Sequence, residues 1–203
     1  MRLISVEILR DKPERRRARY LNSRAYYTII RGVQLLKVDH VRGDLRARLE
    51  KAESFGEIFS IVKRAVREVL GVRRAGLELL LVDLPGEIGA MHQVGSNAII
   101  MNRRHIQAII KFSRSRLEAN SYIFLILLHE YLHSLGVLDE DEVTTLSMKV
   151  IREALGEDHL AYKMAPRKLA EIAEQLINED DLISLDNVEI VKDFDMENAQ
   201  YIG

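Results

Sequence analysis

Two histidines and one glutamate are the residues of this chain whose types and spacing best suit chemistry. They stand in the run His129-Glu130-Tyr131-Leu132-His133. Residues four apart lie on one face of an α-helix, so both imidazoles can reach a single ion, at about 2.0–2.1 Å for zinc. Glu130 does not share their direction, and its carboxylate can instead take a proton from a water molecule in the site. We therefore predict zinc-dependent hydrolysis, with His129 and His133 as ligands and Glu130 as the catalytic base.

The five-residue pattern fixes only three positions, and it also occurs by chance in helices that bind no metal. The surrounding residues favour the metal-site interpretation. Two histidines and a glutamate are costly to bury in the most apolar helix of the chain unless a metal or another partner satisfies them. Gly136 can end that helix and let the chain turn back. Asp139, ten residues after His129, then stands where a third ligand is needed.

Residues 129–139 resemble the extended pattern H-E-x-x-H-x-x-G-x-x-H/D of the metzincin branch of the zincin metallopeptidases, with Asp in the last place. The resemblance implies a zincin-like fold, a zinc cofactor, a peptide or protein substrate and Asp139 as the third ligand. The spacing is also similar to that of zincin-fold endoribonucleases of ribosome maturation. Those proteins lack a glutamate after the first histidine, so Glu130 favours peptide hydrolysis.

A second zincin branch, the gluzincins and their archaeal minigluzincin relatives, takes its third ligand from a glutamate on the next helix. Residues 140–144, Glu-Asp-Glu-Val-Thr, resemble the E-x-E-A-D/N run of that branch, with Thr144 in place of Asp or Asn. This resemblance implies Glu140 as the ligand. We predict Asp139 and keep Glu140 as the alternative, because Glu140 becomes the better candidate if Asp139 only caps the following helix.

Hydrophobic periodicity indicates the elements that must position these residues. Apolar residues on nearly every side of the metal-binding run predict a buried helix, capped by Asn120 or Ser121 and ending at Gly136. Other helices are predicted at residues 13–36, 53–70, 103–117, 139–154 and 165–177. Strands are predicted at residues 3–9, 77–82 and 188–191, with a hairpin over 88–102. The predicted fold class is α+β and zincin-like, a small mixed sheet with the active-site helix beneath it and flanking helices.

The hairpin carries two further candidates. Residues 98–102 are the strand that we expect at the sheet edge, where the resemblance implies that an extended substrate pairs. His92 could polarise a substrate carbonyl, although a lone histidine near a turn is more often an ordinary strand residue. For His159 we expect a loop or cap position, and for Tyr131 a place in the core or in the wall of the pocket.

Charge is distributed unevenly although the net charge is −1. Residues 1–74 hold 19 basic and 9 acidic side chains, whereas residues 139–203 hold 6 and 17. A cluster of Lys12, Arg15, Arg16, Arg17 and Arg19 near tyrosines could bind nucleic acid, or could simply pair with the acidic part of the chain. A zinc-dependent endoribonuclease or other nucleic-acid-associated hydrolase is therefore the alternative function, and a latent, non-catalytic zinc-binding protein is another.

We expect three segments: a basic strand–helix extension over residues 1–52, a zincin-like catalytic domain over 53–178 and an acidic tail over 179–203. Residues 193–203 could lie across the site as an inhibitory segment. The chain has no cysteine, which excludes disulfides and thiolate ligands. It has no apolar run long enough for a membrane span and no signal-peptide pattern, so we expect a cytoplasmic protein. The high charge would suit a heat-adapted archaeal or bacterial source.

Overall fold

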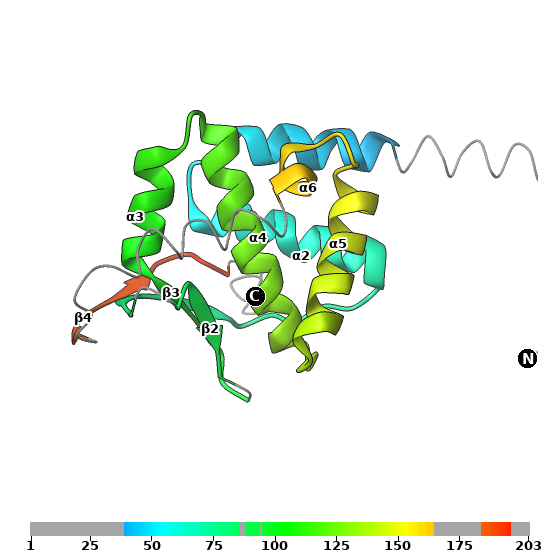
Figure 1. Ribbon diagram of the computed structural model, residues 1–203. Helices are drawn as coiled ribbons and strands as arrows, with labels where there is room; N and C mark the ends of the chain where they lie inside the picture. The colour runs from blue at the N-terminus through cyan, green and yellow to red at the C-terminus, as the bar shows by residue number, and fades with distance from the viewer. Residues whose placement is uncertain (1–38, 86–87, 94, 165–183, 196–203) are drawn as a thin grey trace, which may run out of the picture. The chain divides into compact units, whose positions relative to one another are not determined.

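The computed structural model describes residues 39–85, 88–93, 95–164 and 184–195 (Figure 1). The predicted strand at 3–9, the predicted helices at 13–36 and 165–177, and the basic cluster all lie outside these residues. The chain divides into two units after Val41. The second unit begins at Arg42 and includes the strand at residues 184–191, which lies within the predicted acidic tail. The four strands and the helices α2 to α6 all belong to this second unit.

A four-stranded mixed sheet is built from β1 (Glu78–Asp83), β2 (Ala90–His92), β3 (Ala98–Asn102) and β4 (Ser184–Val191). The strand order is β2-β3-β1-β4. β3 pairs in parallel with β1, while β2 and β4 pair antiparallel with β3 and β1. The predicted hairpin is thus confirmed, but β3 is an inner strand. The expectation that residues 98–102 form the sheet edge is wrong, because β1 occupies the side of β3 that an added strand would need.

The side of the sheet that faces the helices supplies part of the core. Helix α3 (Arg103–Phe112) contacts β1 and β3, and helix α4 (Arg116–Ser134) contacts β2. The strand residues on that side are almost fully buried, namely Leu79, Leu81, Ile99 and Met101. Asn102 at the end of β3 is also buried, and its side chain donates to the carbonyls of Leu84, Pro85 and Ile88. This single amide therefore ties the loop between β1 and β2 to the sheet.

Helix α4 lies at the centre of the helical part (Figure 1). It contacts α2 (Phe55–Leu70), α5 (Glu140–Ala154) and the short α6 (Leu160–Met164). Its residues from Asn120 to Leu128 are all buried, as the apolar pattern predicts. None of the helices in the described ranges is long and apolar enough to cross a membrane.

The start of α4 differs from the prediction. The predicted helix 103–117 ends at Phe112, and Ser115 caps a new helix by accepting a hydrogen bond from the Glu118 amide at 3.1 Å. Asn120 is not a cap of α4. Its side chain instead donates to the Leu49 and Ala52 carbonyls, at 2.8 and 2.9 Å, where the helical residues 39–51 end.

The residues after β4 pack on α2. The Phe194 ring stacks on Phe59 at a centroid distance of 4.2 Å. The Asp195 carboxylate pairs with Lys63 and accepts from the Gly76 amide, and both charged side chains are nearly fully buried. The described part of the proposed inhibitory segment, residues 193–195, is therefore held on α2, and residues 196–203 lie outside the described ranges.

Candidate metal centre

The C-terminal end of α4 is a rigid turn that holds His133. Gly136 has a φ of +97°, and its amide donates to the His133 carbonyl at 2.9 Å. The next amide, that of Val137, donates to the Leu132 carbonyl at 3.3 Å. These two bonds form a Schellman motif, which needs glycine at the left-handed position. The turn brings the Val137 carbonyl to 2.7 Å from His133 Nδ1.

The contact with Val137 decides which nitrogen of His133 is free. A carbonyl oxygen can only accept, so Nδ1 carries the hydrogen and donates it. The neutral ring then has its lone pair on Nε2, the atom that faces the rest of the site. A backbone carbonyl in this role is the usual outer partner of a metal-binding histidine.

Three donor atoms from two helices converge at this point. His133 Nε2 lies 3.1 Å from His129 Nε2 and 3.2 Å from Glu140 Oε1, and His129 Nε2 lies 3.2 Å from Glu140 Oε2. All three ligand atoms lie within 4.8 Å of one another. The two rings are partly buried, while 72% of the Glu140 side chain is exposed. The cluster therefore opens to solvent on one side.

These distances and donor types fit a small divalent cation. Ligands about 2.0–2.1 Å from a tetrahedral zinc ion stand about 3.3 Å apart, close to the separations in this cluster. The His133 Nε2 lone pair faces a carboxylate oxygen and a second imidazole nitrogen, and a single cation would satisfy all three atoms together. The set of two imidazoles and one carboxylate is also one that zinc accepts.

Asp139 lies outside this cluster, so the structure brings the alternative Glu140, rather than Asp139, to the two histidines. Asp139 is the N-cap of α5, and its side chain accepts from the Glu142 amide at 2.8 Å. The cap residue has extended backbone dihedrals, whereas Glu140 is the first residue in the helix. The change of backbone direction between the two residues separates their carboxylates.

Glu130 is a buried carboxyl group next to the cluster. Only 6% of the residue is exposed. Burial raises the pKa of Glu130 to about 8, and the charge of Glu140 contributes to this increase. Without a cation the group is therefore mostly protonated at neutral pH. A carboxyl group that is perturbed by desolvation and by a nearby charge is typical of catalytic sites.

His129 is neutral under the same conditions. Burial lowers its pKa more strongly than the Glu140 carboxylate raises it, and the neighbouring His133 lowers it as well. Neutral imidazole is the form that binds metals, so the pKa shift favours ligation at neutral pH.

The sequence also suggested roles for three other residues, and the structure places each of them. Tyr131 is fully buried, and its hydroxyl accepts from the Arg74 amide, which confirms it as core. His159 Nδ1 accepts from the Ala161 amide at 3.1 Å at the start of α6, which confirms a capping position. His92 lies on β2, which contacts α4, and burial lowers its pKa, with nearby Arg74 and His133 acting in the same direction. His92 is thus the one of the three that lies near the cluster.

Two contributors to the site were missed in the sequence. One is the Val137 carbonyl, for which the glycine of the turn was the only available signal. The other is Arg74, whose guanidinium donates to the Ser134 and Ser96 carbonyls, at 2.6 Å each. Arg74 thereby joins the end of α4 to the β2–β3 turn. The residues around Arg74 in the sequence form no pattern that predicts this role.

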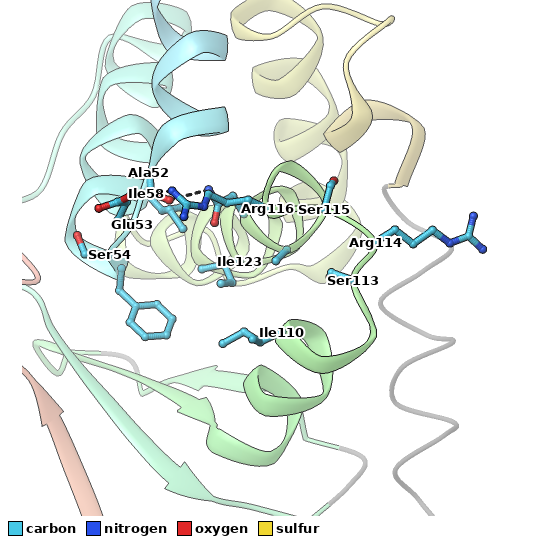
Figure 2. Close-up of a pocket in the computed structure, with 13 residues that line it drawn as sticks. Ala52, Glu53, Ser54, Ile58, Ile110, Ser113, Arg114, Ser115, Arg116 and Ile123 are labelled. Carbon is cyan, nitrogen blue, oxygen red and sulfur yellow. Dashed lines mark hydrogen bonds and ion pairs between the residues drawn. The ribbon is translucent and has the colours of Figure 1, made fainter.

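A separate cavity lies at the other end of α4 (Figure 2). Phe55, Ile58, Ile110 and Ile123 are among its apolar lining residues, and Arg114 and Arg116 lie at its side. Ile123 precedes His133 by ten residues, which is about 15 Å along a helix. This cavity is therefore not part of the metal cluster.

Comparison of the chain with protein-family models, with curated proteins and with solved structures found no match.

Proposed function

We propose that this chain is a zinc-dependent hydrolase of the zincin type that cleaves peptide bonds. The observation that carries the proposal is the convergence of two imidazole nitrogens and a carboxylate on one point, beside the buried carboxyl group of Glu130. His129, His133 and Glu140 would hold the ion, so Glu140 replaces Asp139 as the proposed third ligand. An ion held by these residues would supply an activated water, because zinc lowers the pKa of its bound water to about 7.

Glu130 is the proposed general base. Its carboxylate is the charged form when a cation is close, since an opposite charge favours ionisation. A Glu130 oxygen then takes the proton of the attacking water and gives it to the leaving nitrogen of the peptide. Burial excludes competing solvent from this oxygen and strengthens its interactions in the site.

The sheet edge supports a peptide as the substrate. β2 is an outer strand of the sheet and contacts α4, the helix that carries both histidines. An extended peptide can pair with a free strand edge through main-chain hydrogen bonds. We therefore propose β2, in place of residues 98–102, as the strand that pairs with an extended substrate.

Metal content tests the proposed site. Protein purified without chelator should carry about one zinc ion per chain, as structural and catalytic zinc sites do. His133→Ala and Glu140→Gln should lose zinc, whereas Asp141→Asn should keep it, because this control makes the same charge change in the same helical turn. Absence of zinc from the parent protein contradicts the proposal.

Hydrolysis of casein tests the reaction. Glu130→Gln should keep zinc and lose at least about 100-fold in rate, the usual contribution of a positioned general base. Structured RNA should be incubated in parallel, because a nuclease is the alternative function that the basic cluster near the N-terminus suggests. Cleavage of RNA alone would reverse the assignment.

A further inference from the structure

His92 lies on the side of β2 that faces the helices. In the pairing of β2 with β3 it stands opposite Ile99, which is fully buried. Met91, the preceding residue, stands opposite Ile100 on the other side of the sheet and is 41% exposed. Since β2 contacts α4, the His92 ring lies toward the helix that carries the metal cluster.

The two nitrogens of His92 have different surroundings. Nδ1 lies 2.9 Å from the Ala98 carbonyl, which can only accept, so Nδ1 carries the hydrogen. Nε2 then holds the lone pair of the neutral ring. This atom is buried and has no hydrogen-bond partner within the described residues.

A buried acceptor without a partner is unfavourable unless something satisfies it. The surroundings favour the neutral ring, because burial lowers the pKa of His92 more than the hydrogen bond to the Ala98 carbonyl raises it. His92 does not belong to the group of donor atoms that lie within 4.8 Å of one another. Arg74 donates to the Ser134 carbonyl of α4 and to the Ser96 carbonyl of the β2–β3 turn, so this end of β2 lies beside the last turn of α4. His92 is therefore near the ligand atoms without belonging to their group.

We infer that His92 is a positioning residue of this site, whose Nε2 accepts a hydrogen bond from an N–H or O–H group that enters between it and the two histidines. The donor is either a water molecule or a group of the substrate. The inference rests on the proposed function. It adds a residue from the sheet edge to a site that otherwise comes from α4 and α5.

The two variants His92→Asn and His92→Gln test the roles of the two ring nitrogens separately. Asparagine keeps a donor for the Ala98 carbonyl and removes the Nε2 position, whereas glutamine reaches the Nε2 position with an acceptor. His40→Asn, the same substitution at an exposed histidine in the helical residues 39–51, is the matched control. Thermal unfolding of each variant establishes that the hairpin is intact.

Cobalt(II) added to the protein without substrate gives the first readout. If water is the donor, His92→Asn should change the visible cobalt spectrum and weaken cobalt binding about 10-fold, as loss of an outer partner does. His92→Gln should recover much of both, and His40→Asn should match the wild type. If a substrate group is the donor, the cobalt spectrum should stay unchanged, while KM or kcat for peptide hydrolysis changes about 10-fold in His92→Asn and recovers in His92→Gln.

Three results would overturn the role of His92, and one of them would also overturn the proposed function. A folded His92→Asn protein with wild-type cobalt spectrum, affinity and hydrolysis removes His92 from the site and leaves the proposed function intact. Loss of cobalt stoichiometry in His92→Asn makes His92 a direct ligand instead. A wild-type protein that binds no metal overturns both proposals together.

Discussion

Asp139 and Glu140 are adjacent in the chain, yet their carboxylates serve different purposes. Asp139 accepts a backbone hydrogen bond at the start of α5, and Glu140 reaches the two histidines. Sequence spacing alone could not separate them, because both fit the distance from His133. The choice depends on which residue is the cap, a property of backbone dihedrals rather than of residue type.

Substitution of Asp139 distinguishes the cap from a ligand. Asp139→Ala should lower the free energy of unfolding by about 1 kcal/mol, since alanine cannot accept from the Glu142 amide. Asp139→Asn should keep the stability, because asparagine caps helices as well as aspartate does. Both should bind one zinc ion per chain, measured beside urea unfolding. Loss of zinc in a stable Asp139→Asn protein would restore Asp139 as the ligand.

His159 makes the stability of the fold depend on pH. Burial lowers its pKa to about 4, with a further contribution from the Arg46 guanidinium. In the unfolded chain His159 has a pKa near 6.5, so between pH 6.5 and 4 the unfolded chain binds more protons than the folded one. The contribution of His159 to the free energy of unfolding is therefore fully present above pH 6.5 and is lost as the pH falls toward 4.

Urea unfolding at pH 7 and pH 4.5 measures this effect. The wild type should lose about 2 kcal/mol more between these values than His159→Asn, which keeps an acceptor for the Ala161 amide and does not titrate in this range. An equal loss in both proteins would assign the acid sensitivity to other groups.

At the scale of elements, the turn after α4 determines how His133 is presented. Gly136→Ala places a side chain at a φ of +97°, where the surrounding space is open and only the backbone conformation is unfavourable. We expect a loss of about 1–2 kcal/mol in unfolding free energy. Zinc affinity should fall as well, because the same turn holds the Val137 carbonyl on His133 Nδ1.

Gly43→Ala is the matched control for this prediction. Gly43 lies in the helical residues 39–51, with no atom within 4 Å of an added Cβ and no positive φ. Alanine there should stabilise the protein by about 0.5–1 kcal/mol. If both variants lose stability and zinc alike, the turn has no particular role in the site.

Elements that depend on local sequence were predicted well. The helix predicted at 53–70 is confirmed as α2, which ends at a left-handed C-cap, and the predicted hairpin is confirmed as the β2–β3 pair. Asn120 was misassigned because its partners, the Leu49 and Ala52 carbonyls, are about 70 residues away in the chain. A polar residue before an apolar run is typical of a cap, and only the packed structure shows that another helix end uses it.

At the scale of the whole unit, the strand order could not be predicted. Which strand lies at the edge depends on β1 and β4 pairing across about 100 residues, and periodicity carries no information on such pairing. The same long-range packing holds residues 193–195, the described part of the predicted inhibitory segment, on α2 and not at the metal cluster. Phe194 and Asp195 bind α2, where a charge pattern alone had suggested an inhibitory segment.

Deletion after Asp186 tests this revised view of the segment. The deletion removes part of β4 and the buried Phe194 and Asp195, so it should destabilise the protein rather than activate it. Phe194→Ala alone should cost about 3 kcal/mol or more in unfolding free energy, because it leaves a cavity beside Phe59. Urea unfolding and casein hydrolysis measure both outcomes. A stable truncated protein with increased hydrolysis would support inhibition by the segment.

The pairing of β4 with β1 also orders events during folding. β4 comes after every other described helix and strand in the chain, and contacts between distant residues form slowly because a long loop must close first. The helix pair α4–α5 is linked by a short turn and brings its three ligands together from residues only 11 apart. We expect the metal cluster to assemble early, and the sheet to be completed only when β4 docks and Phe194 reaches α2.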